Sequence, residues 1–584
     1  GAGLRAAIEA RAEGASVGVV CKSLLGKAHT VMAEGGIAAA LGTVRAEDSW
    51  EVHFRDTMRG GKGMNDWRMA RIHAQEAPDR VRELEAWGAL FDRTADGRIL
   101  QRPFGGHTYP RLAHVGDRTG LEMIRTLQDK AVHMDIPVHM ECTVIRLFKD
   151  GARIAGALAY RRDSGRFVLF EAGAIVLATG GAGKAWKVTS NSWEYTGDGY
   201  ALAYDVGAEL VGMEFVQFHP TGMVWPPSVR GTLVTEGVRG EGGVLRNRLG
   251  ERFMFRYIPE MFRGDYAETE EEAQRWVAGD RARARRPPEL LTRDVVARAI
   301  MREIAEGRGT PHGGVYLDIA SQRDADYIRR KLPSMYHQFK ELADVDITRE
   351  PMEVGPTVHY MMGGVKVDPE TQESTVPGLF AAGEAAAGLH GANRLGGNSL
   401  SDLLVFGRRA GLAAARFAGA RSAPRVDAEE VEAAARAALE PFGRSEGDNP
   451  FVLLEELQEL MQADVGMVRT GEGLARALEG ILALRDRLGR ARVTGTREYN
   501  PGWHTWLDLH SLLTAAEAVA RAALERRESR GAHAREDYPD PDPAEGRTHV
   551  VVRREGDAMA IAREPVPELP AELERLIEEG VKVA

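Results

Sequence analysis

Two apolar runs that end in glycines, far apart in the chain, constrain its fold most. Residues 174–179 continue into Gly180-Gly181-Ala182-Gly183, and the sequence VPGLFAAGE at 376–384 repeats the order of apolar run and glycine. A short apolar run bounded by turn residues is typical of a buried strand, and glycines after it let the backbone approach a ligand closely. The pattern predicts an α/β sheet whose strand ends meet a large ligand.

The first residues fit the same interpretation less strongly. Gly1-Ala2-Gly3 opens the amphipathic helix pattern LRAAIEARAEG, and an apolar run follows at 17–20. A glycine turn, a helix and a strand in this order make the latter half of a dinucleotide-binding βαβ unit, whose helix N-terminus binds phosphate. From these residues alone, a glycine-capped helix of structural purpose is the better interpretation.

A third glycine cluster suggests which ligand is bound. The segment GGNSL at 396–400 precedes the helical run SDLLVFGRRAGLAAARF. Free amides at a helix N-terminus present partial positive charge to an electron-rich acceptor, which a flavin pyrimidine ring offers. Tight turns in an α/β sheet explain each cluster singly, but the three together favour a flavin site.

Histidines and arginines recur in five further segments, four of which contain glycine. These are HPTG at 219–222, TEGVRGEGG at 235–243, Arg293-Asp294, HYMMGG at 359–364 and HGANR at 390–394. An arginine offers a planar fork to a carboxylate, and an oriented histidine can donate a hydrogen bond. Each residue taken singly is more often structural, but two histidines with two arginines predict a small-dicarboxylate site.

Charge and cysteine content exclude several classes of protein. The chain carries 76 basic and 86 acidic residues, a net charge of -10, which disfavours nucleic-acid binding. No apolar run reaches about 18 residues, so no membrane span is expected. Cys21 and Cys142 are the two cysteines, too few for a disulfide framework or for the roughly four thiolates of an iron–sulfur cluster. We predict no metal site.

Longer motifs identify a family. They are AHTVMAEGGIAAA at 28–40, HPTG, TEGVRGEGG, RDVVAR at 293–298, HYMMGG, GANRLGGNSL at 391–400 and RRESRGAHAREDYPD at 526–540. Together they resemble the flavoprotein subunit of succinate dehydrogenase and fumarate reductase, over nearly the whole chain. The wider group includes L-aspartate oxidase. His29 separates the two, because the matching histidine of the respiratory enzymes carries the flavin covalently, whereas the oxidases hold it non-covalently.

The resemblance implies a role for each matching position. It assigns proton transfer to Arg293. It implies substrate binding by His219, Thr235, His359 and Arg394, with Glu236 and Phe104 near the same pocket. It implies covalent FAD at His29 and a flavin-binding wall made of Gly1, Ala2, Gly3, Cys21, Lys22, Ala28, Thr30, Glu34, Gly35, Gly36, Ala178, Thr179, Gly180, Asp198, Glu384, Asn398, Ser399 and Leu400.

The resemblance also implies an α/β fold with four parts. A split Rossmann-like FAD-binding domain covers 1–214 and 359–415, and an α+β capping domain covers 215–358. A helical bundle at 425–525 and a small α+β tail at 526–584 follow. Within the cap, the charged stretch 265–288 is expected to be a solvated loop, with a contact to a partner as the less favoured alternative. Leu474, Leu478, Ile481, Leu484 and Leu488 form a helix-spaced stripe, and a strand is expected at 548–555 with a last helix after Pro570.

The implied reaction interconverts succinate and fumarate. A hydride moves between a methylene carbon and the flavin, and a proton moves at the adjacent carbon. The implied partners are membrane anchor subunits that handle quinone, together with an iron–sulfur subunit. They would hold the chain on the cytoplasmic face of the inner membrane. Two alternatives stay open: an L-aspartate oxidase-like enzyme, and a non-catalytic flavin electron-transfer subunit, which the intact histidine and arginine set disfavours.

Overall fold

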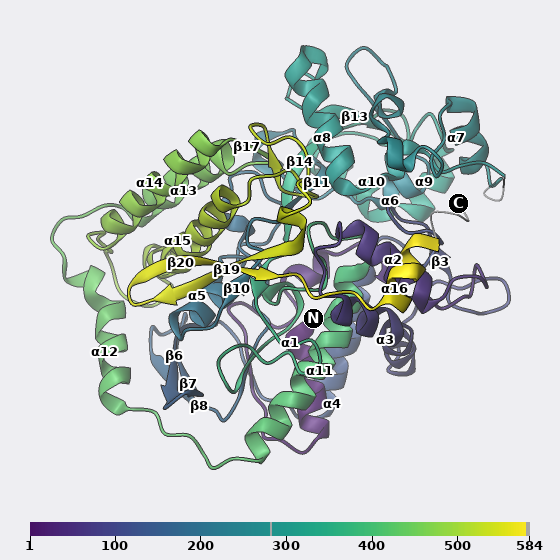
Figure 1. Cartoon of the computed structure of the whole chain (residues 1–584). Coiled ribbons are helices and arrows are strands. Elements are labelled where there is room, and N and C mark those ends of the chain that lie inside the picture. The colour runs from purple at the N-terminus through teal and green to yellow at the C-terminus, as the bar shows by residue number, and fades with distance from the viewer. Residues whose placement is uncertain (281–282, 580–584) are drawn as a thin grey trace.

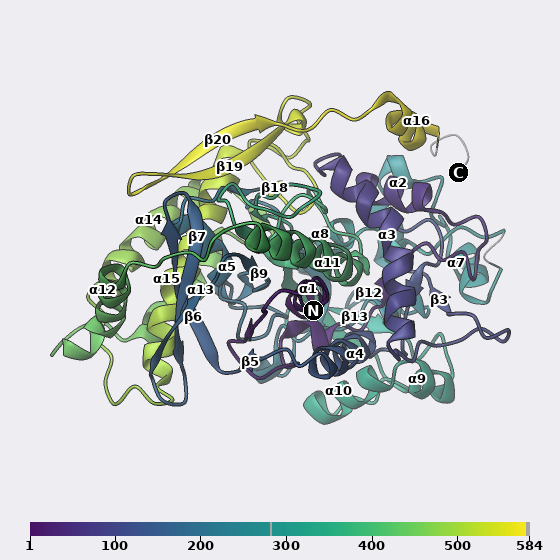
Figure 2. The ribbon, with the colours of Figure 1, turned by 90° about the horizontal axis from the view of Figure 1, so that it is seen from below.

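Segments from distant parts of the sequence build the α/β unit at the centre of the molecule. A computed structural model describes residues 1–280 and 283–579. Helix α1 (Ala2–Ala12) packs along α11 (Asn398–Gly419), as Figure 2 shows. The contact is close because Gly411 has no side chain: a Cβ there would lie 2.1 Å from the carbonyl oxygen of Ala6.

Parallel strand pairs confirm the α/β prediction. β1 (Val19–Val20) pairs with β5 (Val138–His139), and β9 (Ile175–Leu177) pairs with β16 (Leu379–Ala381), so both strand-then-glycine runs lie side by side. The remaining elements of this unit are α2 (Trp50–Gly60), α3 (Trp67–Ala86), α4 (Thr119–His133), α5 (Asp198–Asp205), β2 (Ile37–Ala38), β3 (Gln101–Arg102), β4 (Leu112–Ala113), β6 (Cys142–Asp150), β7 (Arg153–Arg161), β8 (Phe167–Glu171), β10 (Leu210–Val211) and β15 (Gly364–Val365).

A second unit covers one side of the first (Figure 1, teal, upper right). Its antiparallel sheet has the order β11-β14-β13-β12, and its apolar core is drawn from residues 223–354. Its elements are β11 (Val216–Met223), β12 (Val244–Arg246), β13 (Val315–Asp318), β14 (Met352–Met361), α6 (Gly237–Gly240), α7 (Glu270–Val277), α8 (Arg293–Glu303), α9 (Ala325–Lys331) and α10 (Pro333–Ala343).

The expectation of a solvated loop over 265–288 is wrong at its centre. Helix α7 forms there because Thr269 caps it, accepting a hydrogen bond from the Glu272 amide, and because acidic residues occupy its first turn. Ala273, Trp276 and Val277 follow helical spacing and are buried, and Trp276 and Val277 belong to the apolar core of this unit. Residues 281–282 of the stretch lie outside the described part of the chain.

The helical part is a three-helix bundle with a fourth helix set apart (Figure 1). Helices α13 (Pro450–Asp464), α14 (Gly471–Leu488) and α15 (Pro501–Glu525) pack against one another, whereas α12 (Ala428–Leu439) contacts β7 and the turn that follows α12. Leu474, Ile481, Leu484 and Leu488 of the predicted stripe are buried, and Leu478 is half-buried.

The tail returns to the central unit rather than forming a separate body. β19 (Thr548–Glu555) pairs with β10 and with β20 (Ala558–Pro565), and α16 (Ala571–Glu579) lies against α2. The predicted strand and last helix are therefore confirmed. β18 (Ala534–Arg535) pairs with β17 (Val468–Arg469).

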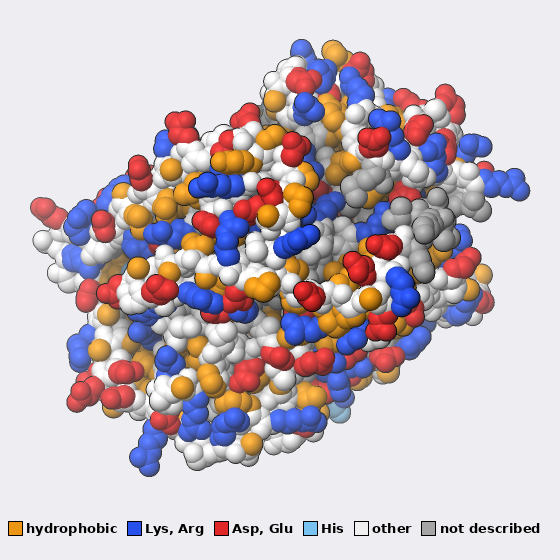
Figure 3. Space-filling model, in the orientation of Figure 1, with side chains coloured by type: hydrophobic (Ala, Val, Ile, Leu, Met, Phe, Trp, Pro, Cys, Tyr) orange, Lys and Arg blue, Asp and Glu red, His pale blue; other side chains and the backbone are white. Residues whose placement is uncertain are grey.

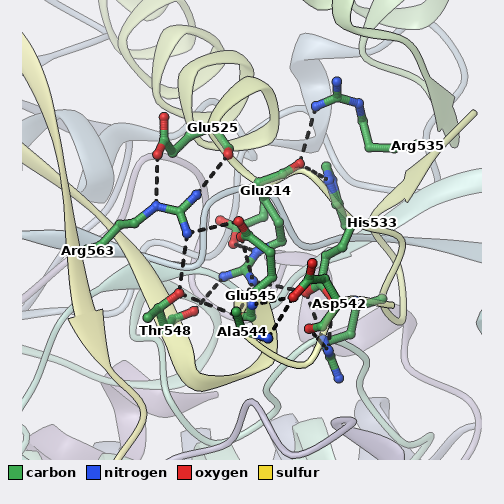
Figure 4. Close-up of polar contacts among 12 residues, drawn as sticks. Glu214, Glu525, His533, Arg535, Asp542, Ala544, Glu545, Thr548 and Arg563 are labelled. Carbon is green, nitrogen blue, oxygen red and sulfur yellow. Dashed lines mark hydrogen bonds and ion pairs between the residues drawn. The ribbon is translucent and has the colours of Figure 1, made fainter. Parts of the chain in front are cut away.

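A buried ion-pair network anchors this tail (Figure 4). Arg526 Nε donates to Glu214 Oε1 at 2.6 Å and its Nη1 donates to Glu528 Oε1 at 3.1 Å. Nearby, the loop at 529–533 reaches the centre of the molecule: the Ala532 amide donates to the Ala392 carbonyl at 2.9 Å, and Arg298 of α8 donates to the Gly531 carbonyl at 2.8 Å.

Three fully buried histidines surround the start of α11. The Nε2 atoms of His53, His73 and His107 lie 2.7 to 2.9 Å from polar atoms of residues 396–401. Burial lowers the pKa of His73 to about 3 and that of His107 to about 4. These imidazoles are therefore neutral at pH 7 and stay so well into the acid range.

We expect acid to destabilise the chain through these histidines. Below pH 6.5 the unfolded chain binds protons that the folded chain excludes, so the free energy of unfolding should fall by about 1.4 kcal/mol per pH unit for each of them. Denaturant unfolding of His73→Gln at pH 7, 6 and 5 should show a shallower pH slope than the unchanged chain. The exposed His133→Gln is the control and should keep that slope, and equal slopes for all three proteins would contradict the prediction.

Charge on the surface is mixed. Figure 3 shows Lys and Arg side chains interspersed with Asp and Glu over the face turned to the viewer. Within residues 1–280 and 283–579, no helix combines the length and apolarity needed to cross a bilayer. The same residues contain no cluster of three or more His, Cys, Asp or Glu suited to hold a metal ion.

Candidate active site

One cavity brings together most of the predicted site residues. It has a volume of about 130 Å³ and lies between the central unit and the covering unit. Predicted residues in its wall are Gly1, Ala2, Ala28, His29, Thr30, Glu34, Gly35, Gly36, Phe104, Ala178, Thr179, Gly180, His219, Thr235, Glu236, Arg293, His359, Glu384, Arg394, Ser399 and Leu400. This set includes residues predicted to bind flavin and residues predicted to bind the substrate.

Five predicted flavin residues lie outside this wall, and their role stays a prediction. They are Gly3, Cys21, Lys22, Asp198 and Asn398. Lys22 Nζ donates to Asp198 Oδ2 at 2.9 Å and to Asp508 Oδ1 at 2.6 Å, so it ties the central unit to α15. Burial would lower the pKa of Lys22, but the two carboxylates outweigh burial and raise it.

Arg293 and Glu236 form a buried ion pair at the cavity wall. Arg293, the first residue of α8, donates from Nε to Glu236 Oε2 at 2.9 Å and from Nη1 to Gln217 Oε1 at 3.1 Å. The other carboxylate oxygen of Glu236 accepts from the Gly105 amide at 2.7 Å. Burial alone would raise the pKa of Glu236, but Arg239, 3.7 Å away, and Arg293 outweigh burial and lower it. The carboxylate is therefore ionised at neutral pH.

Arg394 is a second buried cation in the same cavity, and it forms no ion pair with a described residue. Its guanidinium forms no hydrogen bond with any residue in the described chain, and its Nε is buried. Burial and the charge of Arg293 lower the pKa of Arg394 to about 10, so it remains a cation at pH 7. A buried cation of this kind requires an anion from outside the chain.

Two neutral histidines complete this end of the cavity. His219 of β11 and His359 of β14 lie on paired strands, with ring centroids 5.1 Å apart. His219 Nδ1 lies 3.2 Å from the Thr221 amide, and His359 Nδ1 lies 2.8 Å from Ser190 Oγ. Burial and then Arg293 hold the pKa of both rings well below the usual range. The Nδ1 atoms are engaged by the protein, which leaves the Nε2 atoms for a ligand.

His29 lies in the same wall, in a short 3-10 helix, His29–Met32, and its ring centroid is 6.3 Å from that of His359. Its ring meets Tyr195 edge-on at 4.9 Å between centroids, and its Nδ1 has no hydrogen-bond partner among the described residues. Burial and the charge of Arg394 lower its pKa to about 4. The ring is therefore neutral at pH 7, and Asn191 Nδ2, which can only donate, lies 3.5 Å from its Nε2.

Glu384, at the end of the second strand-then-glycine run, is a buried carboxyl group. Burial raises its pKa to about 8, although the Met361 amide, which donates to it at 3.0 Å, acts in the opposite direction. Glycine at position 181 leaves room for the Glu384 carboxyl group, because a Cβ there would lie 2.4 Å from Glu384 Oε1. At pH 7 this carboxyl group is mainly protonated and can donate a hydrogen bond.

The residues of this wall fit FAD. Glu34 Oε2 and His29 Nδ1 are buried polar atoms that no described residue satisfies, and a bound cofactor would supply their partners. The wall also includes Ser399 and Leu400 in the first turn of α11, where free amides favour an electron-rich ring. The glycines there are needed for packing: a Cβ at Gly396 would lie 2.4 Å from Phe104.

The residues in or behind the wall that were not expected from the sequence include four polar ones: Gln217, Arg239, Tyr195 and Tyr360. Gln217 stands two positions before His219 on the same strand face, and Arg239 stands three positions after Glu236 on one helix face. The two-residue period of a strand and the three-residue spacing on a helix could therefore have predicted Gln217 and Arg239. Tyr195 and Tyr360 line the cavity only because distant segments fold together.

Comparison with known proteins identifies the family. A family model described as "FAD binding domain" matches residues 1–400, and "Fumarate reductase flavoprotein C-term" matches 454–574. A fumarate reductase (CoM/CoB) subunit of Methanothermobacter marburgensis is 46% identical over 564 residues, which cover 96% of this chain and 97% of that protein. The succinate dehydrogenase flavoprotein subunit of Coxiella burnetii is 38% identical over 97% of this chain and 94% of its own length.

A solved structure agrees with these matches. Mycobacterium smegmatis Sdh1 in complex with UQ1 superposes with a TM-score of 0.84 and 56% identity, covering 97% of this chain and 93% of that one. The matches extend over the cavity and the tail alike, which confirms the family resemblance and a FAD-dependent oxidoreductase. This chain belongs to the family of succinate dehydrogenase and fumarate reductase flavoprotein subunits.

Proposed function

We propose that this chain is the catalytic subunit of a succinate:quinone or quinol:fumarate oxidoreductase. One observation carries the proposal: Arg394, a buried arginine whose guanidinium has no partner among the described residues, shares a cavity with two neutral histidines and with Arg293. Such a site binds a small dianion. A four-carbon dicarboxylate meets both requirements, because one carboxylate pairs with Arg394 while the histidines donate to the other oxygens.

The binding residues would hold the substrate in a reactive geometry. Arg394 grips one carboxylate, His219 and His359 orient the molecule, and Thr235 contacts the same region of the wall. Fixing both ends of a four-carbon chain removes most of its freedom, so the central carbons stay in one position. FAD, when bound, supplies the hydride chemistry at those carbons.

Arg293 would carry the proton. In fumarate reduction its Nη group donates a proton to the carbon next to the one that receives the hydride. The ion pair with Glu236, and Arg239 behind it, gives a chain of acidic and basic groups along which Arg293 can be reprotonated. In succinate oxidation the proton moves in the opposite direction along the same groups.

Partner subunits would complete the electron path. Two cysteines cannot ligate an iron–sulfur cluster, so we propose that an iron–sulfur subunit receives the electrons and that anchor subunits exchange them with quinone. The solved Mycobacterium smegmatis Sdh1, which is in complex with UQ1, supports the quinone end of this path. We propose peripheral attachment through these partners at the cytoplasmic face of the inner membrane.

Dye-linked turnover tests the proposed reaction. The flavin-loaded protein should reduce an artificial acceptor with succinate, malonate should compete, and L-aspartate should give no turnover. Reduction with aspartate instead would assign the chain to the oxidase branch. No turnover with either substrate, together with no binding of malonate, would contradict the catalytic assignment.

Covalent attachment at His29 is a separate proposal. The neutral ring has one unprotonated nitrogen, whose lone pair suits attack on an electrophilic carbon of the flavin. We expect the flavin to stay with the acid-denatured chain and to raise the mass of the tryptic peptide that contains His29. His29→Ala should bind flavin that denaturation releases, and the exposed His133→Gln should keep the covalent form. An unmodified mass for the holoprotein would contradict the proposal.

A further inference from the structure

Three buried residues form a group directly behind Arg394. The Arg394 guanidinium carbon lies 4.2 Å from the centroid of the Tyr360 ring. The Tyr360 hydroxyl lies 3.2 Å from His390 Nε2 and 3.4 Å from Asp402 Oδ2, and His390 Nε2 lies 3.3 Å from the same Asp402 oxygen. We call Tyr360, His390 and Asp402 the shelf group. Each is at most 4% exposed.

The shelf group joins three separate parts of the fold. Tyr360 is near the end of β14, Asp402 lies in the first turns of α11, and His390 belongs to the loop between β16 and α11 that also carries Arg394. None of the three takes part in the substrate or proton steps described above. Their convergence on one side chain needs a separate explanation.

Proton positions within the group follow from its chemistry. Carboxylate oxygens accept hydrogen bonds, so the Tyr360 hydroxyl and a His390 Nε2–H can both donate to Asp402 Oδ2. His390 Nδ1 is then the unprotonated nitrogen, in agreement with its lack of a partner among the described residues. Both donors converge on one oxygen, which fixes the direction of the tyrosine hydroxyl and hence the plane of its ring.

The orientation of the Arg394 guanidinium depends on the Tyr360 ring. No described residue accepts a hydrogen bond from its guanidinium, so no polar contact of the protein sets the plane of that group. An aromatic face attracts a cation, and the attraction is stronger where water is excluded. The ring face is the feature that orients the guanidinium before substrate arrives.

We propose that the shelf group positions Arg394 for two-point binding of a substrate carboxylate. Tyr360 supplies the surface on which the guanidinium rests, and His390 and Asp402 hold Tyr360 in place. These are positioning residues, because they act through Arg394. The inference rests on the proposed function in taking a dicarboxylate as the ligand of Arg394.

Malonate binding to the holoenzyme tests the inference without turnover. Tyr360→Leu should weaken malonate binding and raise the KM for fumarate by about 10- to 30-fold. The kcat should stay within about threefold, because an interaction that is equal in the ground and transition states affects KM alone. Tyr360→Phe keeps the ring and loses the hydroxyl, so its effect should be smaller, about two- to fivefold. Asp402→Asn should resemble Tyr360→Phe.

A matched control separates this role from general stability. Tyr204 is also a buried tyrosine, and its hydroxyl donates to the Ala558 carbonyl at 3.2 Å, away from the cavity wall. Tyr204→Leu should leave malonate affinity unchanged, whatever it does to the melting temperature. Flavin content and melting temperature of every variant show whether it is folded.

The outcomes distinguish the two proposals. If the unchanged holoenzyme binds malonate and turns over, but Tyr360→Leu binds malonate within twofold of it, the shelf inference is wrong and the proposed function stands. If Tyr360→Leu changes kcat as well as KM and also has a lower flavin content, the residue has a structural role and the inference is wrong. If the unchanged enzyme neither binds malonate nor turns over, both proposals are wrong.

Discussion

Arg293→Gln should lower succinate oxidation and fumarate reduction by about 10²- to 10⁴-fold, the usual contribution of a positioned proton donor. Glutamine can still accept and donate hydrogen bonds, but it cannot deliver the proton. Malonate should bind within a few-fold of the normal affinity, because Arg394 and the two histidines are unchanged. The protein should fold, since Glu236 keeps the Gly105 amide and the nearby Arg239 as partners.

Steady-state kinetics in both directions would check this result, with stopped-flow flavin reduction to isolate the chemical step. Arg302→Gln is the matched control: it lies on the same helix, its side chain is 68% exposed, and it should leave kcat unchanged. A kcat for Arg293→Gln within tenfold of normal would mean that another group carries the proton.

Arg394→Gln should weaken malonate binding and raise the KM for fumarate by about 10²-fold or more. A carboxylate held by two charge-assisted hydrogen bonds loses roughly 1.5 to 3 kcal/mol for each bond removed, and tenfold in affinity corresponds to about 1.4 kcal/mol. Removing this arginine leaves no protein anion unpaired in the described chain, so stability should be little changed.

Titration of the flavin spectrum with malonate would measure the loss. Arg416→Gln, an exposed arginine on α11, serves as the control for removing one positive charge from the same helix. If Arg394→Gln keeps normal malonate affinity while flavin content is unchanged, the dicarboxylate does not bind at this arginine, and the proposed function loses its main support.

Local sequence rules were sufficient for the main elements. Helix α11 begins within the glycine cluster at 396–400, and both strand-then-glycine runs form a parallel pair, as period and turn residues predicted. The charged stretch around α7 was misjudged because the apolar positions within it, Ala273, Trp276 and Val277, are few and separated by charges. A rule based on composition ignores the spacing of these three residues. That spacing places their side chains on one buried face of the helix.

The site residues also fall into two sets: those that could be predicted from the sequence and those that only the fold brings together. Histidines and arginines beside glycines were visible as a set, and the family resemblance gave each a role that remains a prediction. Lys22, by contrast, pairs with Asp508 at a separation of almost five hundred residues, so no local pattern could reveal it. The same holds for Tyr360 and Asp402, which meet only after β14 and α11 have packed together.

The loop at 529–533 has a consequence for how the protein is made. Its Ala532 amide holds Ala392, two residues from Arg394, and its Gly531 carbonyl holds Arg298 on the helix that begins with Arg293. Both arginines of the cavity are therefore braced by residues that leave the ribosome after the rest of the cavity wall has emerged. A nascent chain lacks this brace, so the cavity reaches its final form only after the segment beyond residue 528 has been translated and has folded back.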